Sequence, residues 1–307
     1  MKTFVVVNPA AGGGRAGKHW PAISGELLGA IGAFDHALTT KPGEATTLVR
    51  RAIQLGAVNI IAVGGDGTIN EAINGLCEGD KPPREELTFG FITLGTGGDF
   101  RRSFDLPKNI SDAIERLKNG NVQTIDLGRL RYTSANGESG QRWFNNIASF
   151  GFSGEVVRAV NAARFSKLLG GKFSFFWNSF WELRKYNGCK VDLAIDGHTI
   201  SREICTAAIC NGRFFGGGMM MAPGAALSDG LFDVVVIEQN PPISIFDMRL
   251  LYSGAHLSHP NVSVYRGKKI EAKPLSNVPV YLDVEGEAPG SLPASFEIVP
   301  AALRLRC

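Results

Sequence analysis

Glycine clusters that follow short apolar runs carry residues able to bind phosphate. The cluster Gly64–Thr68 follows a β-branched run and precedes a segment with helical spacing. Glycine lets the backbone approach a ligand closely, and the free N–H groups of a helix's first turn bind phosphate oxygens. The Asp66 carboxylate would repel bare phosphate, so it fits a place beside Mg²⁺ or a reacting hydroxyl. A plain strand-to-helix turn capped by Asn70 and Glu71 is the alternative.

Two further clusters repeat this arrangement. Residues 8–14, NPAAGGG, follow the first apolar run, although they lack the GKS/T ending of a P-loop and the spacing of GxGxxG. Residues 95–100, GTGGDF, follow another apolar run and add Asp99. Open parallel α/β sheets bind ligands beyond the carboxyl ends of their strands. Three such loops after three strands therefore indicate a nucleotide-binding site.

The elements expected around these clusters alternate between strand and helix, which is typical of a parallel sheet covered by helices. After about residue 126 the pattern changes to successive strands with turns such as Asp196-Gly197, which favours an antiparallel β-sandwich. We expect an α/β nucleotide-binding domain at 1–127 and a β-sandwich at 128–294. The alternating segment 295–307 could return to the first domain.

Composition excludes several classes of protein. Of the 307 residues, 44% are hydrophobic and 20% are charged, which excludes a disordered chain. A net charge of +3 is too small to indicate a nucleic-acid partner. Five cysteines without a CxxC pair fit a reduced, cytoplasmic compartment. The sequence has no apolar window of about 18 residues, so we expect no membrane span. A lipid substrate would then be reached from the membrane surface.

One stretch has a net charge of +6, more than that of the whole chain. Between Arg158 and Lys190 there are seven Lys or Arg residues against one acid, Glu182. Within it, an aromatic stripe falls on one face of an expected helix, which fits either packing on a core or docking at an anionic membrane. The Gly216–Met221 run could line an adaptable lipid groove or form a buried bend. The stripe consists of Phe173, Phe176, Trp177, Phe180 and Trp181.

Several motifs occur together in a characteristic order. These are VVVNPAAGGGRAGK, AVGGDGTINEAINGL, LGTGGDFRRSF, IDLG, CNGRFFGGGMMMAPGAALSDGLFDVVVIE and VEGE. The set resembles the diacylglycerol kinase catalytic family, which includes bacterial lipid kinases and the sphingosine and ceramide kinases. The resemblance extends from Val5 to about Glu287. It implies a phosphofructokinase-like α/β domain and a β-sandwich, with ATP and lipid meeting between them.

The resemblance also implies roles for individual residues. Asp66 belongs both to the central ATP loop and to an acidic set around catalytic Mg²⁺, together with Asp99 and Asp126. The SDGLF segment resembles a second metal loop, with Asp229 as a side-chain ligand and backbone oxygens near Ala226 and Leu231. The implied ATP contacts are Asn8, Pro9, Gly12, Thr39, Gly65, Asp66, Gly67, Thr68 and Thr96.

Two departures from the family pattern stand out. Gly98 replaces the usual Asn of GTGNDF, which removes an amide and could change nucleotide or lipid specificity. Glu285-Gly286-Glu287 replaces the usual DGE, whose acidic residue acts as the general base. The extra methylene of Glu moves a carboxylate by roughly 1 Å, a misplacement that can cost ~10²-fold in rate. We expect Glu285 to be the base, with Glu287 as the next candidate; a solvated hairpin turn is the alternative.

These observations predict an ATP- and Mg²⁺-dependent kinase that phosphorylates a hydroxyl of a diacylglycerol, ceramide or sphingosine lipid at the membrane surface. Two other functions remain open. NAD kinases share the GGDGT loop but act on a soluble substrate. A nucleotide-binding regulator with little catalysis would fit the departures at Gly98 and Glu285. Family members often dimerise, so a homodimer is possible.

Overall fold

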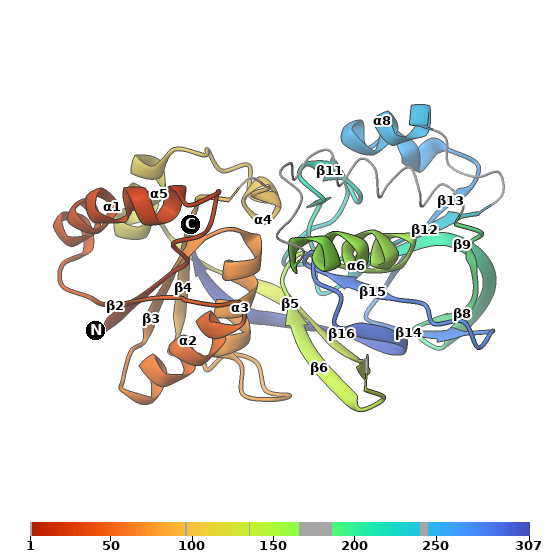
Figure 1. Cartoon of the computed structure of the whole chain (residues 1–307), viewed down its shortest axis with the longest axis horizontal. Helices are drawn as coiled ribbons and strands as arrows, with labels where there is room; N and C mark the ends of the chain where they lie inside the picture. The colour runs from red at the N-terminus through yellow and green to blue at the C-terminus, as the bar shows by residue number, and fades with distance from the viewer. Residues whose placement is uncertain (1, 96, 135, 166–185, 240–244) are drawn as a thin grey trace.

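The computed structural model describes residues 2–95, 97–134, 136–165, 186–239 and 245–307. The chain forms two lobes that lie side by side, and both termini lie in the α/β lobe (Figure 1). Thr96 and the aromatic stripe of residues 173–181 lie outside the described residues. The ATP contact expected of Thr96 and the core or membrane contact expected of the stripe therefore stay predictions.

The first lobe is a parallel sheet in the order β2-β1-β3-β4 with helices between its strands. Strands β1, β3 and β4 are buried almost throughout, as expected for parallel strands covered on both faces. The elements are β1 (Thr3–Val7), α1 (Arg15–Ile31), β2 (Asp35–Leu38), α2 (Glu44–Gln54), β3 (Asn59–Gly64), α3 (Asp66–Leu76), β4 (Thr88–Thr93), α4 (Asp99–Arg102) and α5 (Ile110–Asn119).

The second lobe is built from antiparallel strands. Its longest run has the order β13-β12-β9-β8-β14-β16, while β7 joins β9 to β15 and β5 joins β6 to β16. Four buried phenylalanines, at 144, 150, 232 and 296, lie in its core and contact one another. The expected class, an α/β lobe followed by a β-sandwich, is confirmed.

The elements of the second lobe are β5 (Val122–Ser134), β6 (Ser139–Phe144), β7 (Ile147–Gly151), α6 (Phe152–Phe165), β8 (Cys189–Ile195), β9 (His198–Cys210), β10 (Phe214–Phe215), β11 (Met219–Met220), β12 (Phe232–Glu238), α8 (Ile245–Ser253), the 3₁₀ helix η2 (Ala255–Ser258), β13 (Val262–Gly267), β14 (Lys269–Pro274), β15 (Leu282–Val284) and β16 (Gly290–Arg306).

Strand β16 belongs to both lobes. Near its start it pairs antiparallel with β14, and near its end Leu305 pairs in parallel with Phe89 of β4. Along most of its length it also pairs with β5, which runs through residue 127 without a break. The domain limits at 127, 128 and 295 therefore stay a prediction.

Candidate active site

The three glycine loops meet at the carboxyl edge of the parallel sheet. The Asn8 side chain donates to Thr68 Oγ1 over 3.0 Å, which ties the loop after β1 to the first turn of α3. The Asn8 N–H donates to Val63 O at the end of β3 over 2.9 Å. These bonds fix the positions of two of the implied ATP contacts, Asn8 and Thr68, relative to each other.

Glycine is required where these loops touch. A Cβ on Gly12 would lie 2.3 Å from Leu94 O, and one on Gly95 would lie 2.8 Å from the Gly65 Cα. Gly12 also has φ 63°, a conformation that other residues rarely adopt. By contrast, nothing lies within 4 Å of the Cβ position of Gly67, in the first turn of α3. The backbones are thus closely packed at Gly12 and Gly95, whereas the space beside Gly67 is open.

The other implied ATP contacts lie at the same edge. The Thr39 N–H donates to Val7 O over 2.8 Å, which places the loop after β2 beside the loop after β1. Pro9 O accepts the Gly17 N–H at 3.0 Å, so Pro9 holds the first turn of α1. Pro9 therefore has a structural role, and its expected contact with the nucleotide stays a prediction.

Asp66 and Asp99 form a neighbouring pair of carboxylates. Asp66 accepts the Gly98 N–H at 2.7 Å and the Phe100 N–H at 3.3 Å. Asp99 accepts from Arg102 and from the Gly217 N–H, each at 2.7 Å. Burial, and then the negative charge of Asp66, raise the pKa of Asp99, although the Gly217 amide and Arg102 oppose this.

Gly98 occupies a backbone conformation that Asn could also adopt. Gly98 has φ 70° and ψ 36°, a left-handed conformation that Asn also tolerates. A Cβ there would lie 3.4 Å from the Thr93 Cγ2 atom, an ordinary contact. The loop can therefore take the family's Asn, whose Cβ would face Thr93 and Arg101.

Asp126 makes different contacts from the other two aspartates, and the expected set of three around Mg²⁺ stays a prediction. Its carboxylate is 98% buried and accepts the N–H groups of Gly230 and Ala301, each at 2.7 Å. Across the described ranges, no group of three or more His, Cys, Asp or Glu residues could hold a metal ion. Asp126 instead fastens the SDGLF loop to the irregular middle of β16.

The expected second metal loop carries an ion pair in this structure. The Asp229 carboxylate forms an ion pair with the Arg266 guanidinium and accepts the Leu231 N–H at 3.1 Å. Arg266 also lies 3.6 Å from Asp233. A guanidinium thus supplies the positive charge expected from a metal. The ligand roles expected of Asp229, Ala226 and Leu231 stay a prediction.

Glu285 lies at the turn after β15 with φ 55°. Its Oε1 atom accepts the N–H groups of Asn145 and Asn146, at 3.0 and 2.7 Å, in the link between β6 and β7. Burial raises the pKa of Glu285 to about 8, and the negative charge of Asp66 adds to the shift against the two amides. The solvated turn considered for this segment is therefore wrong for Glu285. It is a partly buried carboxyl group suited to proton transfer.

Glu287 occupies a different environment. Its Oε2 atom lies 2.5 Å from Arg142 Nη1, and its side chain is 42% exposed. Asp283, on β15, is buried and accepts the Gly286 N–H at 2.9 Å; burial raises its pKa to about 7. Of the two glutamates, Glu285 therefore has the environment expected of a base.

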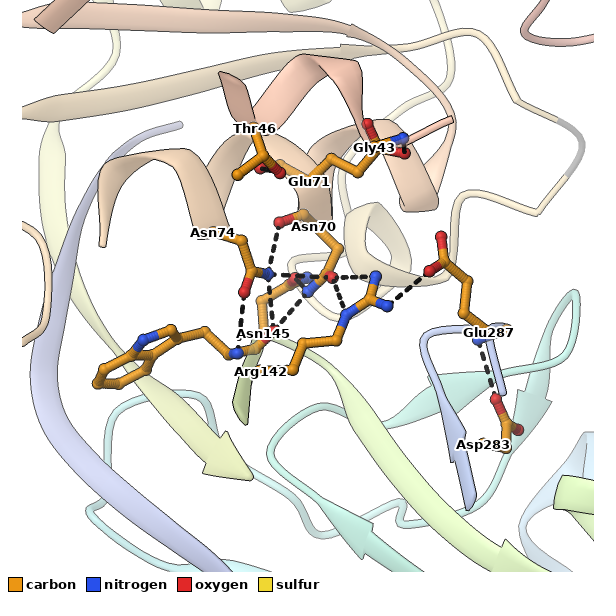
Figure 2. Close-up of polar contacts among 11 residues, drawn as sticks. Gly43, Thr46, Asn70, Glu71, Asn74, Arg142, Asn145, Asp283 and Glu287 are labelled. Atoms are coloured by element: carbon orange, nitrogen blue, oxygen red, sulfur yellow. Dashed lines mark hydrogen bonds and ion pairs between the residues drawn. The ribbon is translucent and has the colours of Figure 1, made fainter. Parts of the chain in front are cut away.

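A polar network that was not expected from the sequence joins α3 to β6 (Figure 2). The buried Asn70 amide donates to Trp143 O and to Asn145 Oδ1, both at 3.0 Å, and its Oδ1 accepts from Arg142. The Asn74 side chain donates to Trp143 O at 2.9 Å. The sequence feature that could have indicated this network is the spacing of Asn70 and Asn74, which lie four residues apart on one helix face.

Asn70 and Glu71, which would cap α3 in the alternative of a plain strand-to-helix turn, do not cap it. Asn70 joins the network just described, and no side chain caps α3 at Gly65. Glu71 accepts the N–H groups of Gly43 and Ala45, at 2.9 and 3.2 Å, and so fixes the start of α2 (Figure 2). Helix α3 therefore carries Asp66 at its start and contacts α2 and β6 one turn later.

Comparisons with known proteins agree with this architecture. A model described as "Diacylglycerol kinase catalytic domain" matches residues 2–130. One described as "YegS C-terminal NAD kinase beta sandwich-like domain" matches residues 146–307, more than half of the chain. A diacylglycerol kinase of Staphylococcus aureus (strain JH9) is 30% identical over 84% of this chain and 77% of its own length.

Solved structures share the fold. A crystal structure of a diacylglycerol kinase from Bacillus anthracis str. Sterne superposes with a TM-score of 0.71 at 21% identity, covering 99% of this chain and 96% of that one. Yeast NADH kinase complexed with NADH is more distant, with a TM-score of 0.53 at 11% identity, covering 99% of this chain and 82% of that one. With both family models and the curated relative in agreement, the chain belongs to the diacylglycerol kinase catalytic family.

Proposed function

We propose that this kinase uses ATP and Mg²⁺ to phosphorylate a hydroxyl group of a membrane lipid of the diacylglycerol, ceramide or sphingosine class. The observation that carries the proposal is that the glycine-loop edge and the hairpin of Glu285 are connected by a side chain. The Arg142 guanidinium donates to Asn70, one turn after Asp66 on α3, and pairs with Glu287, two residues after Glu285. The negative charge of Asp66 also raises the pKa of Glu285. A phosphate-binding edge thus faces a candidate general base across the two lobes.

The glycine loops would bind the nucleotide. The backbone of Gly65 and Gly67 and the first-turn N–H groups of α3 are suited to phosphate oxygens. Asp66 and Asp99 would hold Mg²⁺, because this ion typically takes one or two carboxylates together with substrate phosphates. Each carboxylate keeps lone pairs beyond the hydrogen bonds described. Bound Mg²⁺ would neutralise charge that develops on the transferred phosphoryl group.

Glu285 would act on the acceptor. A hydroxyl placed between the lobes would give its proton to the Glu285 carboxylate as its oxygen attacks the γ-phosphorus in line. The products would be a lipid phosphomonoester and ADP. The Asn145 and Asn146 amides hold the Glu285 Oε1 atom, so the carboxylate starts the reaction in a fixed orientation.

Family relatives support the choice of a lipid, since the curated relative compared above is named diacylglycerol kinase. No helix among the described residues is long and apolar enough to cross a membrane. We propose that the protein works in the cytoplasm and reaches its substrate at the membrane surface, with the basic segment 158–190 as the contact and a homodimer as a possible assembly.

The test is a phosphotransfer assay with γ-labelled ATP, Mg²⁺ and a panel of diacylglycerol, ceramide and sphingosine in mixed micelles, with NAD and NADH as soluble acceptors. Asp66→Asn protein is the control for contaminating kinases. Label in one lipid class, absent with Asp66→Asn, would support the proposal and name the substrate. Label only in NAD or NADH would replace it with a soluble-substrate kinase. ATP binding without transfer to any acceptor would favour a regulator.

A further inference from the structure

The Arg142 guanidinium connects the two halves of the proposed site. Arg142 Nε and Nη2 donate to Asn70 Oδ1 at 3.2 and 3.0 Å, and Nη1 pairs with Glu287 at 2.5 Å (Figure 2). Asn70 is four residues after Asp66 on α3, and Glu287 is two residues after Glu285. A single side chain of β6 therefore bridges the helix of the glycine loop and the hairpin of the base.

The partner of Arg142 on α3 has a fixed orientation. The Asn70 Nδ2 group donates to Trp143 O and Asn145 Oδ1, so its carbonyl oxygen must face Arg142. Asn70 has no exposed surface, which makes loss of either set of bonds costly. The contact between Arg142 and Asn70 therefore has a single hydrogen-bonding arrangement.

We propose that Arg142 is a positioning residue that fixes the Glu285 carboxylate relative to Asp66, with Glu287 as its anchor on the hairpin. This rests on the proposed function for the roles of Glu285 and Asp66. Since Glu287 is paired with Arg142, it is not the alternative base. A hairpin released at Glu287 would let Glu285 move, and a displacement of about 1 Å can cost about 10²-fold in rate.

The chain supplies a matched control pair. Arg129 on β5 also lies 2.5 Å from a glutamate, Glu297 on β16, and its side chain is 16% exposed, as is that of Arg142. The exposures of the two glutamates are also alike, 44% and 42%. Arg129 also lies 3.8 Å from Asp80 and packs over the Trp143 ring. Neither Arg129 nor Glu297 forms an ion pair with α3 or with the hairpin after β15 among the described residues.

The first experiment measures kcat and KM for Arg142→Met, Glu287→Gln, the double variant, Arg142→Lys and the control Arg129→Met. We expect Arg142→Met to lower kcat by about tenfold to hundredfold while both KM values change by less than about threefold. The double variant should be no slower than Arg142→Met, because both changes break one connection. Arg142→Lys should recover part of kcat, and Arg129→Met should match the wild type.

The second experiment needs no substrate. Hydrogen–deuterium exchange of the full chain should show faster exchange at residues 145–146 and 286–287 in Arg142→Met and Glu287→Gln than in the wild type or Arg129→Met. Unchanged exchange there, additive losses of kcat, or a raised KM with normal kcat would each overturn the positioning role. If the exchange pattern appears but the wild type phosphorylates no lipid, the proposed function fails while the mechanical connection stands.

Discussion

The glycine-loop edge and the hairpin of Glu285 achieve the same end, a fixed carboxylate, in different ways. Asp66 is held by N–H groups of the loop after the neighbouring strand β4, and the backbones there touch at glycine. Glu285 is held by amides between β6 and β7, and its hairpin is tied through Arg142 to a helix of the other lobe. The first site depends on local backbone geometry, and the second depends on contacts between distant segments.

This difference predicts different responses to mutation. Changes at the glycine-loop edge should act through sterics and charge within that edge. Changes at the hairpin should propagate, because Arg142 of β6 and Asp283 of β15 bond to it and Arg142 also bonds to Asn70 of α3. A set of substitutions can separate the two kinds of site.

Asp66→Asn should give the largest effect. We expect kcat to fall by about 10³-fold, because the change removes the charge proposed to hold Mg²⁺ next to the phosphates. ATP binding should persist, since the glycine backbone that would hold the phosphates is unchanged. Single-turnover assays and equilibrium dialysis with labelled ATP measure the two quantities. Equal losses in both would show that Asp66 acts in binding rather than in transfer.

Glu285→Gln should have the next largest effect, lowering kcat by about 10²-fold or more because it removes the base. Glu287→Gln should cost less, about tenfold to hundredfold, because it only loosens the hairpin. Steady-state assays of the two variants side by side provide the measurement. A larger loss from Glu287→Gln would move the base to that residue.

The pH profile should show the raised pKa of Glu285. A base works in its unprotonated form, and burial raises the pKa of Glu285 to about 8. The value of kcat/KM should therefore fall about tenfold per pH unit below about 8 and level off above it. Measurements from pH 6 to 9 test this, with Glu285→Gln as the control. The same slope in Glu285→Gln would assign the titration to another group.

Two glycine substitutions should give the smallest effects and contrast with each other. Gly12→Ala would place a Cβ 2.3 Å from Leu94 O at a φ of 63°, so ATP binding should weaken about tenfold. Gly98→Asn should change ATP affinity by less than about threefold, because the left-handed turn accepts Asn and the space is adequate. Titration with a fluorescent ATP analogue compares them. A stronger loss from Gly98→Asn would show that the open space at Gly98 is used by the nucleotide.

The sequence predicted those parts of the molecule that short segments determine. Strand-to-helix spacing and glycine clusters predicted the parallel lobe and the positions of Asn8, Asp66 and Thr68 at one edge. The contacts of Asp126 and Asp229 could not be predicted, because the amides of Gly230 and Ala301 and the Arg266 side chain meet them only in the folded chain. Arg142 was missed for the same reason, since its partners are distant in sequence.

The pairing of Leu305 with Phe89 also determines when the parallel sheet can be completed during synthesis. Strand β4 leaves the ribosome early, but its neighbour β16 emerges only after the other strands of the β-sandwich. Until then the edge of β4 next to the buried Phe89 and Phe91 has no partner, and an open apolar edge can pair with other chains. The nascent chain therefore passes through a stage in which its nucleotide-binding half is unfinished, and a chaperone that shields strand edges would be most useful at that stage.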